Sequence, residues 1–385
     1  MHLPALLLAL LLTPFTAADC ECGYALTLDA HPPQPDERHV FTELTESNFA
    51  RLHAGGDNDV RRNTDWAPQA FNVSAERGRG AYGEMFSARN VDMPAGDGGL
   101  RLTVGSELVR GMVPTAEVAT RRLDMMWGTF RASMRLTGVE GTCAAFFWVG
   151  VSPVVITSLG GEELTECWGQ YFNDTQEIDM EFLSKDFNRA NGSYPVNLVL
   201  QSLEAAAANY DASHTGTFVK AYLPFDPTAG FHEYRIDYFA GRVRFYADGV
   251  VLAHMDGPAV PVTAGHLIMR HWSNGNKLWS GGPPERDAAV VVKYVKAYFN
   301  SSSPKRQADW ERRCRNPKEP NAVCDIPNVT TKNLTAQDWF FSENANMTNN
   351  QTVHGLNGVS GRRVEAVSGV MWALLLVSGC ALVLL

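Results

Sequence analysis

Short runs that alternate apolar and polar residues extend from about residue 102 to residue 299. The clearest case is Phe231–Met255, in which apolar and aromatic side chains occupy every second position of each run. Within it, Ala240-Gly241 can make a turn and Asp248-Gly249 is a strong hairpin signal. Similar runs predict strands at Leu100–Val104, Thr129–Leu136, Ala144–Val149, Val196–Gln201 and Ala288–Phe299.

This pattern predicts an all-β domain, because many short antiparallel strands separated by turns are typical of a sandwich or a barrel. The single amphipathic helix that the pattern indicates lies just beyond it, at Lys305–Arg313. Residues 19–100 are rich in loops, but no linker separates them from the strands, so we assign them to the same domain. Beyond Asn300 the composition turns to Asn, Thr and Ser, which indicates a tail.

Both ends of the chain carry targeting signals. Met1–Ala18 has an apolar run that ends in small residues, which is typical of a signal peptide. Val370–Leu385 is apolar but short for a bilayer span, and it follows a small-residue stretch and a polar spacer. This order favours a GPI-attachment signal over a short transmembrane anchor, and it predicts a secreted protein held at the cell surface by lipid alone. The expected domains are 1–18 signal peptide, 19–300 β domain, 301–357 tail and 358–385 GPI signal.

Six cysteines remain once the two end segments are removed, and an even number in a secreted chain predicts three disulfides. We expect one bridge between Cys143 and Cys167, with Cys20, Cys22, Cys314 and Cys324 paired among themselves. Glycosylation sequons begin at Asn72, Asn173, Asn191, Asn300, Asn328, Asn333, Asn346 and Asn350. Because four of them crowd into 328–352, we expect a glycosylated stalk there.

The composition and charge of the chain exclude several classes of protein. The chain has 385 residues, of which 45% are apolar and 19% charged, with a formal net charge of -9. These values argue against disorder and against a polytopic membrane protein. An acidic balance also disfavours a nucleic-acid partner, because phosphate binding needs clustered Lys and Arg.

The candidate chemistry lies in the segment 176–184, which reads QEIDMEFLS. Glu177, Asp179 and Glu181 occupy alternate positions, so on a strand all three carboxylates lie on one face and the intervening apolar residues on the other. Acidic residues are poor strand formers, and three like charges on one face repel one another. A solvated strand face is the alternative, but the unfavourable composition favours a functional site.

The spacing of these carboxylates suits one reaction. Four residues place the two Glu Cα atoms about 13 Å apart, and side chains that lean inward bring the carboxyls to about 5 Å, as in a retaining glycosidase. Asp179 lies between them and can hydrogen-bond one Glu, which helps to separate the two pKa values. Such a separation leaves one Glu ionised as nucleophile and the other protonated as acid.

The motif E-I-D-M-E-F resembles the signature of glycoside hydrolase family 16, and the resemblance extends over roughly residues 100–300. Flanking segments strengthen it: Trp127–Phe130, Gly141–Val149, His232–Tyr234 with Tyr246–Gly249, Trp272–Asn274 and Trp279–Gly282. The whole chain is similar to the fungal GPI-anchored cell-wall glucanase and transglycosylase type.

The resemblance implies a curved β-jelly-roll sandwich, the concanavalin A-like lectin/glucanase fold, with a glycan cleft on its concave face. By position, Glu177 would be the nucleophile, Asp179 the assisting carboxylate and Glu181 the general acid/base. It further implies cleavage of a β-glucan polysaccharide and transfer to an acceptor glycan, with chitin as one candidate acceptor. An endo-β-1,3(4)-glucan hydrolase is the main alternative, and a lectin-like glycan-binding module the other.

Aromatic faces stack on sugar rings, so we expect the cleft to be lined by residues of this kind and one amide: Trp148, Tyr171, Trp272, Trp279 and Asn274. No H-E-x-x-H or calcium-loop motif is present, so we expect no metal in the site, although family members often hold a structural Ca²⁺ away from the cleft. We expect no other cofactor, and a monomer. The G-x-G-x-x-G match at residues 78–83 has neither the strand nor the helix of a nucleotide site, and indicates a glycine-rich loop.

Overall fold

The computed structural model describes residues 19–28, 37–54, 65–94, 96–151, 175–330, 332–344 and 346–347. The expected signal peptide and GPI signal, Cys167, Tyr171 and the sequons at Asn173 and Asn350 lie outside these residues. Residues up to His354 belong to one compact unit. In the described part of the chain, every helix is too short or too polar to cross a membrane.

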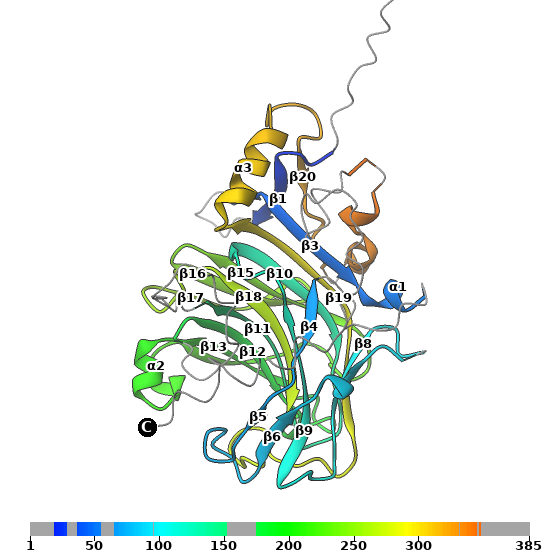
Figure 1. Ribbon diagram of the computed structural model, residues 1–385, viewed down its shortest axis with the longest axis vertical. Helices are drawn as coiled ribbons and strands as arrows, with labels where there is room; N and C mark the ends of the chain where they lie inside the picture. The colour runs from blue at the N-terminus through cyan, green and yellow to red at the C-terminus, as the bar shows by residue number, and fades with distance from the viewer. Residues whose placement is uncertain are drawn as a thin grey trace, which may run out of the picture. The chain divides into compact units, whose positions relative to one another are not determined.

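Among the described residues, seventeen strands form one continuous sheet that folds into two layers, which we describe as two sheets, and three further strands form a small separate sheet (Figure 1). We call the first the front sheet. Its strands lie in the order β14 (Phe218–Tyr222), β13 (Pro195–Gln201), β12 (Glu177–Leu183), β11 (Cys143–Gly150), β18 (Gly265–Trp272) and β9 (Met112–Thr120). Along the far edge of β9 lie β4 (Trp66–Pro68) and β6 (Gly83–Phe86), and β5 (Asn72–Val73) pairs with β6.

The second, or back, sheet is built around two long central strands, β10 (Met125–Arg135) and β19 (Ala288–Ser301). On one side β10 continues to β15 (His232–Phe239), β16 (Arg242–Ala247) and β17 (Val250–Asp256). The other edge of β19 is shared by β3 (Glu43–Asn48) and β8 (Leu100–Val104), with β7 (Val91–Asp92) beyond β8. Apart from β6 with β9, all pairings in the front and back sheets are antiparallel, which confirms the all-β sandwich.

The core lies between the two sheets, and the period-two pattern determines which residues enter it. Ile178, Met180 and Phe182 of β12 are all fully or almost fully buried there, as expected. Phe182 packs edge-on against Tyr234 of β15, with ring centroids 4.7 Å apart. Because these side chains alternate with the three acids, burying them turns the acids to the outer face of the front sheet.

The strands expected from the alternating pattern are all present, with ends that shift by a few residues. The turn at Asp248-Gly249 joins β16 to β17, and both residues have positive φ, 45° and 77°. Asp248 is held there by its side chain, which accepts from the Glu233 amide at 2.8 Å and lies 2.7 Å from His232 Nδ1. A Cβ on Gly249 would lie 2.3 Å from the carbonyl oxygen of Val329, so glycine is required where the C-terminal segment packs on this turn.

The described part of the segment expected to be a stalk is packed on the domain, which corrects that expectation. Residues 323–344 include β20 (Val323–Asp325) and the 3-10 turns η5 (Leu334–Asp338) and η6 (Phe341–Glu343). Lys296 of β19 donates to the Gln337 and Trp339 carbonyls at 2.8 and 2.7 Å, and Phe341 is buried against Tyr24 and Tyr298. The stalk was expected from composition, and composition does not show that these residues cover the back sheet.

Beneath this segment, polar residues of the back sheet are buried instead of solvated. Arg235 and Asp237 form a buried ion pair in β15, and the Arg235 guanidinium lies 4.1 Å from the Tyr246 ring centroid. Arg131 donates to the Pro327 carbonyl at 2.8 Å. The polar residues that alternate along β10 and β15 therefore face the C-terminal segment, not solvent, and pack against it.

The two ends of the described chain are joined. β1 (Gly23–Leu28) pairs with β2 (Glu37–Phe41) and, in parallel, with β20. Disulfides link Cys20 to Cys324 and Cys22 to Cys314, which confirms the expected pairing of these four cysteines among themselves. Cys143 is a buried thiol that is free among the described residues, and Cys167, its expected partner, lies outside them. The Cys143 side chain lies 3.8 Å from a carboxylate oxygen of Glu181.

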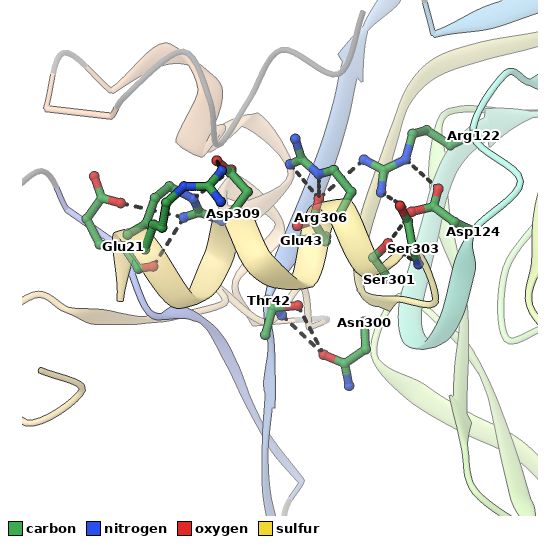
Figure 2. A network of polar contacts seen from close by, with 12 residues as sticks. Glu21, Thr42, Glu43, Arg122, Asp124, Asn300, Ser301, Ser303, Arg306 and Asp309 are labelled. Carbon is green, nitrogen blue, oxygen red and sulfur yellow. Dashed lines mark hydrogen bonds and ion pairs between the residues drawn. The ribbon is translucent and has the colours of Figure 1, made fainter. Parts of the chain in front are cut away.

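The expected helix is confirmed as α3 (Pro304–Arg313), and it docks through charge (Figure 2). Arg306 donates to Glu43 Oε2 at 2.8 Å, and Arg122 lies 3.3 Å from the same oxygen. Arg122 also holds Asp124 with two contacts of 2.6 Å. Two further helices are short, α1 (Phe49–Ala54) and α2 (Leu203–Ala207), as are the 3-10 turns η2 (Ala88–Asn90), η3 (Ser184–Asp186) and η4 (Ala212–His214).

Candidate active site

The three acids of β12 lie on the outer face of the front sheet, which we call the active face. Asp179 is buried, whereas Glu177 and Glu181 are partly exposed. Their neighbours follow from the register: Asp179 lies between Phe147 of β11 and Val199 of β13, and Glu181 lies opposite Ala145. An apolar floor of Ala119, Ala145, Phe147, Val149 and Ile268 therefore extends beside the acids.

Glu181 is the acid whose environment is most fully defined. Its Oε1 accepts from the indole Nε1 of Trp279 at 3.2 Å. Burial raises the pKa of Glu181, while the Trp279 hydrogen bond and the charge of Arg270 act in the opposite direction. A raised pKa favours the protonated form of the carboxyl, which is the form that a general acid needs.

Arg270 is the positive charge on the active face, in the same cross-strand row as Glu181 and Ala145. It forms an ion pair with Glu84 of β6, and its Nε lies 3.7 Å from Glu117 of β9. Its guanidinium also lies 5.2 Å from the Trp272 ring centroid. Sequence reasoning missed Arg270, although its position two residues before Trp272 on one strand puts both side chains on the same face.

Two walls border the active face. The helix wall, residues 203–214, contains α2 and η4 and covers Val199 of β13 with Ala205 and Ala212. The loop wall combines the glycine-rich loop 78–83 with residues 274–281, which follow β18. The two loops are joined by a hydrogen bond from the Tyr82 amide to the Asn274 carbonyl at 2.9 Å.

Two of the expected sugar-binding residues are not presented on the active face. Trp148 is fully buried in the core and donates its indole N–H to the Met125 carbonyl at 3.3 Å. Side chains of a strand alternate between its two faces, and Trp148 lies opposite Ile178, which points into the core. The neighbouring Phe147 is therefore the aromatic residue of β11 on the active face. The register of β11 against the acid motif carries this information, and the sequence reasoning did not use it.

Asn274 is the second residue whose expected contact with sugar the structure does not support. It is buried, and its Nδ2 donates to the Gly78 carbonyl at 2.6 Å and to Glu84 Oε1 at 3.3 Å. Its Oδ1 accepts from the Asn276 amide and from the Ser280 hydroxyl. With both donors and its acceptor engaged, Asn274 holds the loop wall together and has no donor left for a sugar.

The other two described candidates reach the active face. Trp279 contacts Glu181 from the loop wall, and Trp272 lies on the outer side of β18 beside Arg270. Tyr171 falls outside the described residues. The described residues bring no three His, Cys, Asp or Glu side chains together as metal ligands.

The chain is similar to known proteins in sequence and in fold. A model of the family described as Glycosyl hydrolases family 16 matches residues 84–296, which include the three acids, the helix wall and residues 274–281 of the loop wall, but not the glycine-rich loop 78–83. A beta-glucanase of Paenibacillus polymyxa is 28% identical over 228 residues, 57% of this chain and 80% of the relative. A Crh-like protein 2 of Botryotinia fuckeliana (strain B05.10) is 25% identical over 142 residues, 32% of this chain and 28% of the relative.

Among solved structures, a beta-1,3-1,4-glucanase (lichenase) derived from a mouse hindgut metagenome has a TM-score of 0.47 and 19% identity. It is matched over 66% of this chain and 98% of its own.

Proposed function

The chain belongs to glycosyl hydrolases family 16, and from this membership we propose that it is a retaining enzyme that cleaves β-glucan-type bonds and transfers the glycosyl group to an acceptor glycan. The observation that carries the proposal is the row of Glu177, Asp179 and Glu181 on one face, with the pKa of Glu181 raised. The relative from Paenibacillus polymyxa, a beta-glucanase, supports β-glucan as the donor.

The chemistry takes two steps. In the first, a Glu177 oxygen bonds to the anomeric carbon, the bond from that carbon to the leaving oxygen breaks, and the Glu181 proton passes to that oxygen. In the second, Glu181 removes a proton from an acceptor hydroxyl, whose oxygen bonds to the anomeric carbon and releases Glu177. The role proposed for Asp179, between the two, is to hydrogen-bond one of them and so help to separate their pKa values.

Water in place of the acceptor hydroxyl gives the alternative function, an endo-β-1,3(4)-glucan hydrolase. The names of the bacterial relatives, beta-glucanases, favour it. The two functions share every residue of the mechanism and differ in whether a sugar hydroxyl outcompetes water. Chitin-derived chains are one acceptor class that we propose to test.

The test incubates the protein with β-1,3-glucan, mixed-linked β-1,3/1,4-glucan and chitin oligosaccharides, with and without labelled acceptors, and analyses the products by mass spectrometry. Labelled chimeric products support the transferase, and shortened glycans without label support the hydrolase. Glu177→Gln should abolish both while glycan binding persists, because the amide cannot act as the nucleophile. The control Glu107→Gln changes an exposed glutamate and should leave turnover intact. Unchanged turnover in Glu177→Gln would overturn the assignment.

We also propose that the protein acts at the cell surface as a monomer, secreted through residues 1–18 and anchored by lipid after removal of residues 358–385. The sequence features of these two segments support this proposal. Release of the protein from cells by a phosphatidylinositol-specific phospholipase would be the expected result, and retention on the membrane would contradict the lipid anchor.

A further inference from the structure

The two walls of the active face are connected by one side chain. Arg79 of the loop wall donates from its guanidinium to the Asn209 carbonyl of the helix wall at 2.5 Å, and it lies 5.1 Å from the Tyr210 ring centroid. We propose that this Arg79 bridge is a gate over the glycan site that selects chain ends and short glycans against the interior of a long chain. The inference rests on the proposed function of the site.

The anchors of the bridge lie on opposite sides of the acids. On the loop wall, Asn276 donates to the Arg79 carbonyl at 3.1 Å, in the segment that follows β18. On the helix wall, Gln201 of β13 donates to the Tyr210 carbonyl at 3.5 Å. Between β13 and β18 the front sheet contains β12 and β11. A side chain that joins the two walls therefore passes over the strand that carries the acids.

The Arg79 bridge lies close enough to the proposed acid/base, Glu181, to act on it through charge. The positive charge of Arg79 acts on Glu181, where it favours the ionised carboxylate. Trp279, from the same loop wall, donates to Glu181 directly. The loop wall, the bridge and the acid/base thus form one continuous unit on the active face.

The backbone at both anchors is held in an unfavourable conformation. Arg79, Asn209 and Tyr210 have φ of 56°, 56° and 62°, in the left-handed region that asparagine tolerates and bulky residues rarely adopt. Such conformations persist where surrounding contacts impose them, and they concentrate at ligand clamps and switches. Local turns hold these conformations next to the bridge: the Arg79 amide donates to the Glu76 carbonyl at 3.1 Å, and the Tyr210 amide to the Ala205 carbonyl at 2.7 Å.

This geometry has a direct consequence for substrates. The interior of a polysaccharide cannot lie across β12 until Arg79 leaves Asn209, whereas a short chain or a chain end can enter beneath the bridge. Opening exposes a guanidinium and an aromatic ring, groups that hydrogen-bond hydroxyls and stack on sugars. Arg79 is thus a specificity-determining residue, outside the catalytic acids.

The kinetic test compares kcat/KM on a long β-glucan with kcat/KM on a trisaccharide or tetrasaccharide, for the full chain and its variants. Arg79→Ala should raise the long-to-short ratio about tenfold, and Tyr210→Ala, which changes no charge, should move it in the same direction. The double variant should add little to either single one, because both remove the same contact. Arg89→Ala, another exposed arginine, is the matched control and should leave the ratio unchanged. Equal changes on both substrates would overturn the gate.

A second measurement needs no substrate. Hydrogen exchange followed by mass spectrometry should show faster exchange in both walls, residues 78–83 and 205–211, in Arg79→Ala than in the wild type or in Arg89→Ala. Unchanged exchange would mean that the bridge does not form in solution, and would overturn the proposal whatever the kinetics. Because this result does not depend on turnover, it is separate from a failure of the wild type to act on β-glucan.

Discussion

At the scale of single residues, the protonation of Glu181 is the property on which catalysis depends. Burial raises the pKa of this carboxyl, and the indole N–H of Trp279 lowers it by stabilising the ionised form. Trp279 therefore tunes the pH range over which Glu181 can act as an acid.

Replacing the Trp279 indole should change the pKa of Glu181 in a known direction. Trp279→Phe keeps an aromatic ring but removes the donor, so the pKa of Glu181 should rise further. A general acid must be protonated, so the alkaline limb of the pH profile of kcat/KM should move upward by about one unit. The exposed Trp339, replaced in the same way, is the control. A limb that stays in place, or moves to lower pH, would show that Glu181 is not the acid.

Single residues also show where sequence reasoning succeeds and where it stops. The orientation of Glu177, Asp179 and Glu181 follows from the period of a strand, and the structure confirms it. Trp148 and Asn274 were chosen for their chemistry alone. Their orientation depends on the register between strands and on contacts with a loop nearly 200 residues away, which the local pattern does not contain.

At the scale of elements, α3 illustrates a helix fastened by charge instead of apolar area. Glu43 is almost fully buried on β3, and it contacts Arg306 of the helix and Arg122 of the loop between β9 and β10 (Figure 2). A carboxylate shared by two arginines is costly to remove, because both guanidiniums then lose the buried negative charge that they share.

We therefore expect Glu43→Gln to lower the free energy of unfolding by about 3 kcal/mol, the range for breaking a buried ion pair. Glu311→Gln, on the exposed side of the same helix, should change it by less than about 0.5 kcal/mol. Urea titration of both variants measures the difference. A stability equal to that of the wild type would mean that α3 docks through other contacts.

Many strands and α3 could be predicted from the sequence, but the segments that they pack against could not. The strands expected from the alternating pattern, the hairpin turn at Asp248-Gly249 and α3 follow from local pattern and turn chemistry, whereas short strands such as β4, β5 and β20 were not predicted. The packing of residues 323–344 on the back sheet depends on buried polar residues such as Lys296 and Arg131, whose alternation looks the same as that of a solvated face.

At the scale of the whole molecule, the two disulfides close the described fold on itself. The cysteines of the two bridges are separated by 304 and 292 positions in the sequence. The bridges therefore connect the first strand to the segment that covers the back sheet. In the chain-entropy account, closing a long loop restricts the unfolded state and stabilises the folded one.

The variant Cys22→Ser with Cys314→Ser should therefore lose about 3 kcal/mol of unfolding free energy in urea, with the active face unchanged. Cys20→Ser with Cys324→Ser is the matched pair and should lose a similar amount. Both variants should retain the kcat/KM of the wild type below the transition. Lost activity without lost stability would instead connect these bridges to the site.

The order of strands in the front sheet also determines when the site can form. Glu181 pairs with β11 a few dozen residues earlier in the chain, but Arg270 reaches the same row only from β18, and its ion-pair partner Glu84 lies 186 positions before it. Contacts this distant in sequence form slowly during folding. While the ribosome is still synthesising β18, the three acids already exist without their counter-charge. The front-sheet strand that comes last in the chain, β18, thus completes the site, and a chain that ends before it has the acid motif without Arg270.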